Sequence, residues 1–234
     1  MQKPGVDDFD EPRPALLDAA AAQTLRGEMD RYLQTRAGGG VAPASLDGPD
    51  AAGECSRAYA ALPPGPQLYR ALSSHVQCAE RWLLEPDAES KLKGLDVLRE
   101  VALCSVERAR DKKLGIDLCK AYLLPRLDYA SPDTGDKLSA ANLLGTCLYV
   151  FGEAGADAER LQAYRLLLHM SEDENTRNAT RLRIANIFES QGNFREAIRY
   201  LRGIDPEGAM GGARLLLQQL EKKALEKEKR TRAK

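Results

Sequence analysis

Histidine and cysteine, the side chains best suited to metal or nucleophilic chemistry, are few and scattered in this chain of 234 residues. The two histidines, His75 and His169, lie on separate predicted helices and form no recognisable catalytic pair. The cysteines are odd in number and outside any C-x-x-C pair, which is typical of reduced side chains buried on helices. They are Cys55, Cys78, Cys104, Cys119 and Cys147. We therefore expect no catalytic residue, no metal and no cofactor, and a protein that is not an enzyme.

Two short segments imitate binding motifs but lack the residues on which those motifs depend. Residues 48–55 have the glycine spacing of a phosphate-binding loop, but Glu54 and Cys55 stand where that loop has lysine and serine or threonine. Residues 7–11, with the sequence Asp-Asp-Phe-Asp-Glu, are acidic enough to attract Mg²⁺. Carboxylates on an unanchored tail make no preorganised metal site. We interpret the first segment as a linker and the second as a solvated acidic tail or a short partner-binding motif.

Composition limits what the surface as a whole could attract. The chain has 34 basic and 35 acidic residues, a balance that creates no field to draw nucleic acid or an anionic membrane. Residues 1–14 lack the apolar run of a secretory signal, and no stretch approaches the roughly 18 apolar residues of a membrane span. We expect a soluble, cytoplasmic protein without a membrane partner.

Periodicity and glycine or proline content divide the chain into five segments. Residues 1–14 are predicted to be a disordered acidic tail, residues 15–37 a helix, and residues 38–66 a flexible linker rich in glycine and proline. Residues 67–212 form a domain of successive helices, and residues 213–234 a capping helix with a basic tail. The predicted helices span residues 15–36, 67–84, 88–110, 114–124, 137–151, 157–170, 175–190 and 194–202. Because no long stretch alternates apolar and polar residues, the fold class is all-α.

Two segments of the helical domain match each other when one is moved by 34 residues. Residues 162–170 then lie over residues 196–204, and Ala, Arg and Leu recur in the same places. Each segment follows another helical run, so the pattern predicts an antiparallel helical hairpin that is used twice. Self-similarity at such a period is typical of stacked helical repeats.

The second hairpin resembles a tetratricopeptide repeat. Its first helix carries Ile184-Ala185-x-x-Phe188, its turn is Gly192-Asn193-Phe194, and its second helix carries Ala197-x-x-x-Leu201, followed by Pro206. Small residues in this pattern let helices approach closely, while the large ones fill the space between neighbouring hairpins. The chain departs from the family at Arg181, which stands where the family often has Trp.

The first hairpin follows the same order. It carries Leu144-Gly145-x-x-Leu148 and then Ala163-x-x-x-Leu167. Its turn is predicted to be six residues longer, through an insertion of Ala, Gly and Asp after Gly152. The resemblance covers residues 137–206 and implies stacked antiparallel hairpins in a short α-solenoid.

The resemblance also implies a function. Members of the family act as non-catalytic scaffolds or adaptors that hold a peptide or a helix of another protein on a concave surface. In the family this surface is lined mainly by positions of the first helices that do not pack. Carried onto the two hairpins, these positions are Asn142, Thr146, Tyr149, Leu182, Asn186 and Glu189. Amide side chains there could bond the backbone of an extended peptide.

The carboxy-terminal segment leaves other functions open. Residues 213–234 begin with leucines and end in a basic run, with eight basic and three acidic residues. The first turns could cap the last hairpin, and the tail could contact nucleic acid or an acidic partner. Alternatively, the same helices could form a permanent interface, which would make the protein a structural subunit of a larger assembly.

Overall fold

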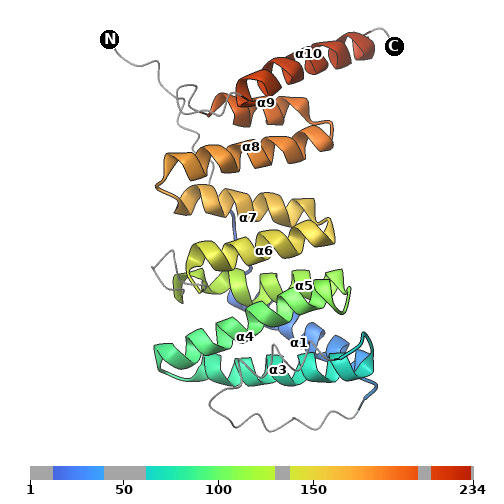
Figure 1. The fold of residues 1–234 in the computed structure, drawn as a ribbon, viewed down its shortest axis with the longest axis vertical. Helices are drawn as coiled ribbons and strands as arrows, with labels where there is room; N and C mark the ends of the chain where they lie inside the picture. The colour runs from blue at the N-terminus through green and yellow to red at the C-terminus, as the bar shows by residue number, and fades with distance from the viewer. Residues whose placement is uncertain (1–12, 40–61, 130–137, 205–211, 233–234) are drawn as a thin grey trace. The chain divides into compact units, whose positions relative to one another are not determined.

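The computed structural model describes residues 13–39, 62–129, 138–204 and 212–232, and in these ranges the regular elements are helical, without strands (Figure 1). The predicted all-α class is therefore confirmed. The chain divides into two compact units, and the boundary falls after Ala156, within the domain predicted for residues 67–212. We call residues Ala15–Ala156 the amino-terminal unit and the residues from Asp157 onward the carboxy-terminal unit. Most of the predicted disordered tail and most of the predicted linker lie outside the described residues.

In its described residues, the amino-terminal unit has five α-helices and a distorted helical segment. Its elements are α1 (Ala19–Arg36), α3 (Pro66–Leu84), α4 (Ala88–Glu107), α5 (Lys112–Leu118), the π-helical turn η1 (Cys119–Leu123), the 3₁₀ segment η2 (Leu124–Tyr129) and α6 (Ala140–Ala154). Helices α3 and α4 pack together, and α1, which the sequence separates from them by a predicted linker, packs against α3, α5 and η1. The amino-terminal helix is thus part of the core of this unit.

Short polar residues set where many of the described helices begin, in both units. At each such start, a side-chain oxygen accepts a hydrogen bond from the backbone N–H three residues later, which satisfies a donor that the first helical turn leaves without a partner. These N-cap residues are Asp18, Asp87, Asp111, Ser139 and Asp173. The predicted and observed starts accordingly differ by only a few residues.

Two glycines allow the helices of the amino-terminal unit to approach closely. A Cβ atom on Gly94 of α4 would lie 2.9 Å from the carbonyl oxygen of Ala79, and one on Gly115 of α5 would lie 2.7 Å from Cγ1 of Val106. Real Cβ atoms do not approach other atoms so closely. Alanine at either position would therefore push the helices apart.

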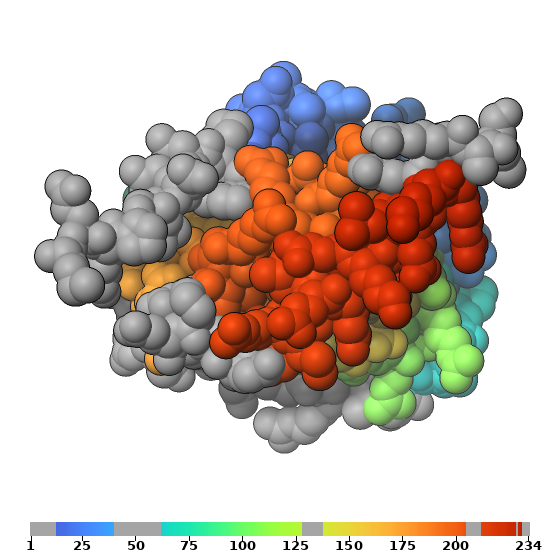
Figure 2. Space-filling view, turned by 90° about the horizontal axis from the view of Figure 1, so that it is seen from above, coloured from blue at the N-terminus to red at the C-terminus, as the bar shows by residue number. Residues whose placement is uncertain are grey.

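The carboxy-terminal unit consists of α7 (Asp157–Met170), α8 (Glu174–Ser190), α9 (Phe194–Arg202) and α10 (Gly212–Arg232). Helices α8 and α9 form the predicted second hairpin, in which the rings of Phe188 and Tyr200 stack with their centroids 5.7 Å apart. Helix α10 packs against α9 and buries Ala213 and Leu220 (Figures 1 and 2).

The predicted six-residue insertion after Gly152 is wrong. Helix α6 continues through Gly152 to Ala154 and ends at Gly155, whose φ of 70° is left-handed; helix α8 ends in the same way at Gly192, with a φ of 69°. Each helix then closes with a hydrogen bond across six residues, from Ala156 N–H to Phe151 O and from Asn193 N–H to Phe188 O. Helices α7 and α9 begin two residues after these glycines, so the extra residues lengthen the helices and not the turn.

Candidate functional site

The three predicted binding positions on α6 differ in exposure. Asn142 is exposed and Tyr149 is 45% exposed, whereas Thr146 is buried and its hydroxyl donates to the carbonyl oxygen of Asn142 at 3.1 Å. The Tyr149 hydroxyl bonds the carboxylate of Glu107, and this bond raises the pKa of Tyr149. A Cβ atom on Gly145, which lies between the two exposed positions, would meet no atom within 4 Å. Asn142, Gly145 and Tyr149 therefore form an open strip along α6.

The predicted positions on α8 belong to the other unit and are described by themselves. Asn186 is exposed, and Leu182 is half-buried. Glu189 is also half-buried, and its carboxylate accepts a hydrogen bond from Lys223 of α10 at 2.8 Å. The side chain of Glu189 is thus engaged within the chain. Asn186 is the most accessible of these three residues.

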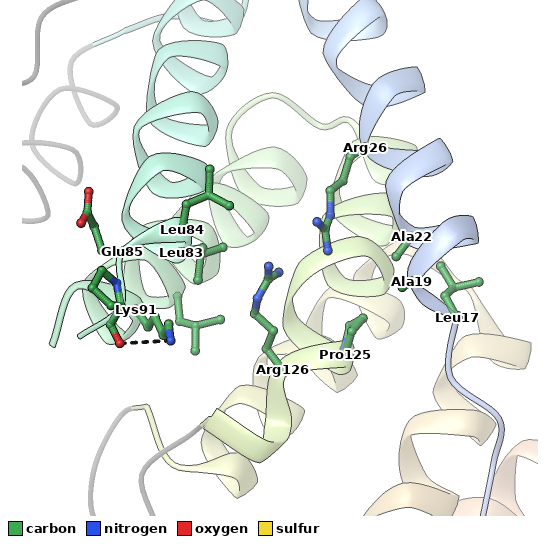
Figure 3. Close-up of a pocket in the computed structure, with 12 residues that line it drawn as sticks. Leu17, Ala19, Ala22, Arg26, Leu83, Leu84, Glu85, Lys91, Pro125 and Arg126 are labelled. Carbon is green, nitrogen blue, oxygen red and sulfur yellow. Dashed lines mark hydrogen bonds between the residues drawn. The ribbon is translucent and has the colours of Figure 1, made fainter. Parts of the chain in front are cut away.

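A cavity that the sequence did not predict lies in the amino-terminal unit (Figure 3). It has a volume of about 510 Å³, within the range of typical ligand pockets. It lies between the start of α1, the junction of α3 with α4, and η2. The residues that line it are Leu17, Ala19, Ala22, Arg26, Leu83, Leu84, Glu85, Pro86, Lys91, Leu95, Pro125 and Arg126. We call it the basic cavity, because three of these side chains are cationic and one is acidic.

One wall of the basic cavity owes its shape to Pro125. The helix predicted for residues 114–124 ends before this proline, but the chain continues through a π-helical turn and then a 3₁₀ segment that is kinked at Arg126. Because Pro125 has no N–H, the carbonyl of Ala121 four residues earlier lacks its usual helical donor. Arg26 of α1 supplies the donors instead, through Nε at 3.3 Å and a terminal nitrogen at 3.0 Å. This contact fixes α1 beside η1 and holds Arg26 at the cavity.

A second polar cluster anchors the other end of α1. The carboxylate of Asp111, the N-cap of α5, accepts hydrogen bonds from the hydroxyls of Tyr32 at 2.5 Å and Tyr69 at 2.8 Å. Arg36 donates to the Tyr69 hydroxyl at 3.0 Å and lies 4.7 Å from the centre of its ring. Burial, together with the hydrogen bond to Asp111, raises the pKa of Tyr32 and of Tyr69. Asp111 thereby links α1, α3 and α5.

Two carboxylates come close together between these anchors. Burial, followed by the nearby charge of Glu80, raises the pKa of Asp30 on α1. The Tyr122 hydroxyl donates to Glu80, and the ring of Tyr122 lies 4.9 Å from the guanidinium of Arg26. Paired carboxylates can serve as acid and base in catalysis. Here Glu80 is held by a tyrosine whose own pKa is raised by burial, which is an arrangement that also suits a structural contact.

Four of the cysteines and His75 are buried in the helical core. Cys78, Cys104, Cys119 and Cys147 are buried thiols outside disulfide bonds, as predicted for reduced cysteines on helices; Cys55 lies outside the described residues. His75 is buried, and burial lowers its pKa. Although Cys78 follows His75 by three residues, a metal-binding group of three or more ligands is absent from the part of the chain that the structure describes. Residues 48–55, which have the glycine spacing of a phosphate-binding loop, and the acidic residues 7–11 fall outside that part.

The basic carboxy-terminal helix makes contacts within its own unit. Lys227 donates to the carbonyl oxygen of Gly192 at 2.9 Å and lies 5.5 Å from the ring centre of Phe194. Arg202 of α9 pairs with Glu221 at 2.8 Å. Lys227 thus lies over the turn between α8 and α9, whereas Arg202 lies at the far end of α9. Figure 2 shows α10 in red against orange neighbours of the same unit.

Within the described ranges, none of the helices combines the length and the apolar character that crossing a bilayer requires. Comparison of the chain with protein-family models, with curated proteins and with solved structures found no match. The resemblance to tetratricopeptide repeats therefore rests on the sequence of residues 137–206 alone.

Proposed function

We propose that this chain is a non-catalytic interaction scaffold or adaptor, whose helical hairpins hold a peptide or a helix of another protein. The observation that supports the proposal best is the open strip of Asn142, Gly145 and Tyr149 on α6. The opposite face of the same helix is buried, including Leu143, Leu144 and Cys147. An exposed amide and an exposed aromatic ring beside a glycine offer a partner both hydrogen bonds and a close approach.

The tetratricopeptide-like arrangement belongs to the same proposal. The α8–α9 hairpin supports it, because Ala185 and Ala197 are fully buried while Asn186 remains exposed. Small buried residues let neighbouring helices pack closely, and an exposed amide on the first helix can form hydrogen bonds with a ligand. In this proposal, Asn142 on the amino-terminal unit and Asn186 on the carboxy-terminal unit each offer an amide to the backbone of a partner.

The test is affinity capture with the intact chain, followed by identification of the proteins that co-purify. Asn142→Ala combined with Asn186→Ala should reduce the recovery of the partner and leave the melting temperature nearly unchanged, since exposed substitutions cost within about 0.5 kcal/mol. The matched control is Gln34→Ala combined with Gln218→Ala, which removes one exposed amide from each unit. Equal recovery with the asparagine and glutamine variants would contradict the proposal.

A structural subunit of a larger assembly is the second candidate. Leu215 and Leu225 of α10 are 58% and 59% exposed, and exposed leucines on a terminal helix suit a permanent interface.

Binding of nucleic acid by the basic tail is an outcome of the same capture experiment. It would be lost on removal of residues 227–234 and would fall steeply as the salt concentration rises.

A further inference from the structure

The basic cavity collects positive charge on a chain whose net charge is only −1. Arg26, Lys91 and Arg126 reach it from α1, α4 and η2, and Glu85 is the one acidic side chain among the twelve that line it. Figure 3 shows the guanidinium groups of Arg26 and Arg126 directed into the same space. Like charges that converge on a cavity repel each other, and an anion between them relieves that repulsion.

The hydrogen bonds of Arg26 leave it suited to bind an anion. Both of them go to the carbonyl oxygen of Ala121, which does not neutralise the charge of the guanidinium. A guanidinium carries five N–H donors, and its planar fork matches the two oxygens of a carboxylate. The contact with Ala121 also holds the Arg26 side chain in place before a ligand arrives, which lowers the entropic cost of binding.

The rim of the basic cavity is apolar. Leu84, at the end of α3, is 85% exposed, and Leu17 is half-buried before the start of α1. These two leucines place apolar surface directly beside the charged pocket. The twelve lining residues include no aromatic ring on which a nucleic-acid base could stack. These features favour a ligand that has carboxylates and apolar groups close together.

We propose that the basic cavity binds a segment of a partner protein in which aspartate or glutamate side chains adjoin a leucine-like side chain. The carboxylates lie between Arg26 and Arg126, and the apolar side chain covers Leu84. This inference rests on the proposed function as an interaction scaffold and names where one class of partner binds. The cavity is formed by elements outside residues 137–206, so it is separate from the surface that the repeat resemblance implies.

The test is a titration of the full-length, isotope-labelled protein with two capped peptides, followed by nuclear magnetic resonance. One peptide is acetyl-Leu-Asp-Glu-Leu-amide, and the other is its neutral counterpart acetyl-Leu-Asn-Gln-Leu-amide. We expect the acidic peptide to produce saturating shifts at the methyl groups of Leu84 and the Nε–H groups of Arg26 and Arg126. The neutral peptide should bind about tenfold more weakly, as expected when charge-assisted hydrogen bonds are lost at a partly solvated site. Equal binding of both peptides, or no saturable shift at the cavity, would overturn the inference.

Variants separate charge recognition from damage to the fold. Arg126→Gln and Lys91→Gln should each weaken binding of the acidic peptide, and Arg126→Gln should weaken it by about tenfold. Their matched controls, Arg31→Gln and Lys93→Gln, change exposed cations outside the cavity and should leave binding unchanged. If Arg126→Gln fails to fold, Leu84→Ser provides the test, because a side chain 85% exposed contributes little to the core. We expect Leu84→Ser to weaken binding of the acidic peptide by about threefold and to leave the melting temperature unchanged. Equal losses in the controls would overturn the inference.

Two further measurements identify the ligand class and separate this inference from the proposed function. Inorganic phosphate should compete only weakly; if it saturates the same shifts at the concentration that the peptide requires, the site is a phosphate site and the inference is wrong. In affinity capture, the Arg126→Gln/Lys91→Gln variant should lose the partner that the wild-type chain recovers. A partner retained by this variant but lost by the Asn142→Ala/Asn186→Ala variant would refute the basic cavity as its site and uphold the scaffold function.

Discussion

The first and last described helices are held in their respective units by different kinds of contact. Helix α1 is fixed by the buried carboxylate of Asp111 and by the bond from Arg26 to the carbonyl of Ala121. Helix α10 buries Ala213 and Leu220, and its polar contacts, such as Lys223 with Glu189, lie at the surface. Water can replace a surface partner but not a buried one, so the loss of one group costs far more at α1 than at α10.

Asp111→Ala should have the largest effect. The change removes the N-cap of α5 and leaves the hydroxyls of Tyr32 and Tyr69 without their acceptor, so we expect a loss of about 3 kcal/mol of unfolding free energy. Urea unfolding followed by circular dichroism measures this loss. Asp87→Ala is the control, because Asp87 caps α4 at the surface and bonds no tyrosine. Equal losses in the two variants would show that the tyrosine contacts contribute nothing.

Arg181→Ala extends the comparison to a buried charge of the carboxy-terminal unit. Arg181 is 5% exposed and donates to Glu174 at 2.9 Å and to Asn178 at 3.1 Å. Since Glu174 remains largely exposed, the change strands only the amide of Asn178, and we expect a loss of about 2 kcal/mol. Arg177→Ala is the control, because Arg177 lies one turn earlier and 3.6 Å from the same carboxylate, but is 37% exposed. If both variants lose the same amount, burial is not what makes Arg181 important.

Asp30→Asn should stabilise the amino-terminal unit. Burial and the charge of Glu80 raise the pKa of Asp30, so the folded state binds a proton more tightly than the unfolded state does. Stability therefore falls as the pH rises from the ordinary pKa of 3.8 through the raised value, and the wild type bears this cost at neutral pH. We expect a higher melting temperature for Asp30→Asn at pH 7, with a difference from wild type that shrinks on acidification. A difference independent of pH would contradict this explanation.

Lys223→Ala should have the smallest effect. The ion pair with Glu189 has side chains that are 50% and 26% exposed, and such pairs contribute less than about 1 kcal/mol. The difference from wild type should disappear in high salt, which screens exposed charges. Thermal melts at low and high salt test this, with Lys222→Ala as the exposed neighbour for comparison. A large loss of stability that does not depend on salt would mean that α10, like α1, is held by a contact that water cannot replace.

The helices were predictable from the sequence because their signals are local. Apolar periodicity and N-cap residues such as Asp87 and Asp173 lie within the segments that they define, and the observed helices follow them. The offset between the two matching segments was not predictable, because a helix repeats every three to four residues and a sequence alignment can slip by one turn. The glycines that end α6 and α8, Gly155 and Gly192, lie 37 positions apart, whereas the sequence match was made at 34.

The basic cavity was not predictable because its residues come from three separate parts of the chain. Arg26 and Arg126 are 100 positions apart, and no local pattern connects them. Pro125 was the available signal. In the sequence this proline predicts the end of a helix. In the fold it frees a carbonyl that Arg26 then bonds, and this depends on tertiary packing. The candidate positions on α6 and α8 were found from the repeat pattern, and their exposure varies because neighbours such as Lys223 cover some of them.

The most direct test of the scaffold proposal is site-specific photocrosslinking on α6. A benzoylphenylalanine at position 149 replaces a tyrosine that is 45% exposed, so it reports what lies against the open strip. The same residue at position 225 of α10 samples an exposed leucine outside that strip. We predict that position 149 crosslinks to the protein that affinity capture recovers, and that the adduct disappears when an excess of the unlabelled partner is added. An adduct with that partner at position 225 and none at position 149 would contradict the account.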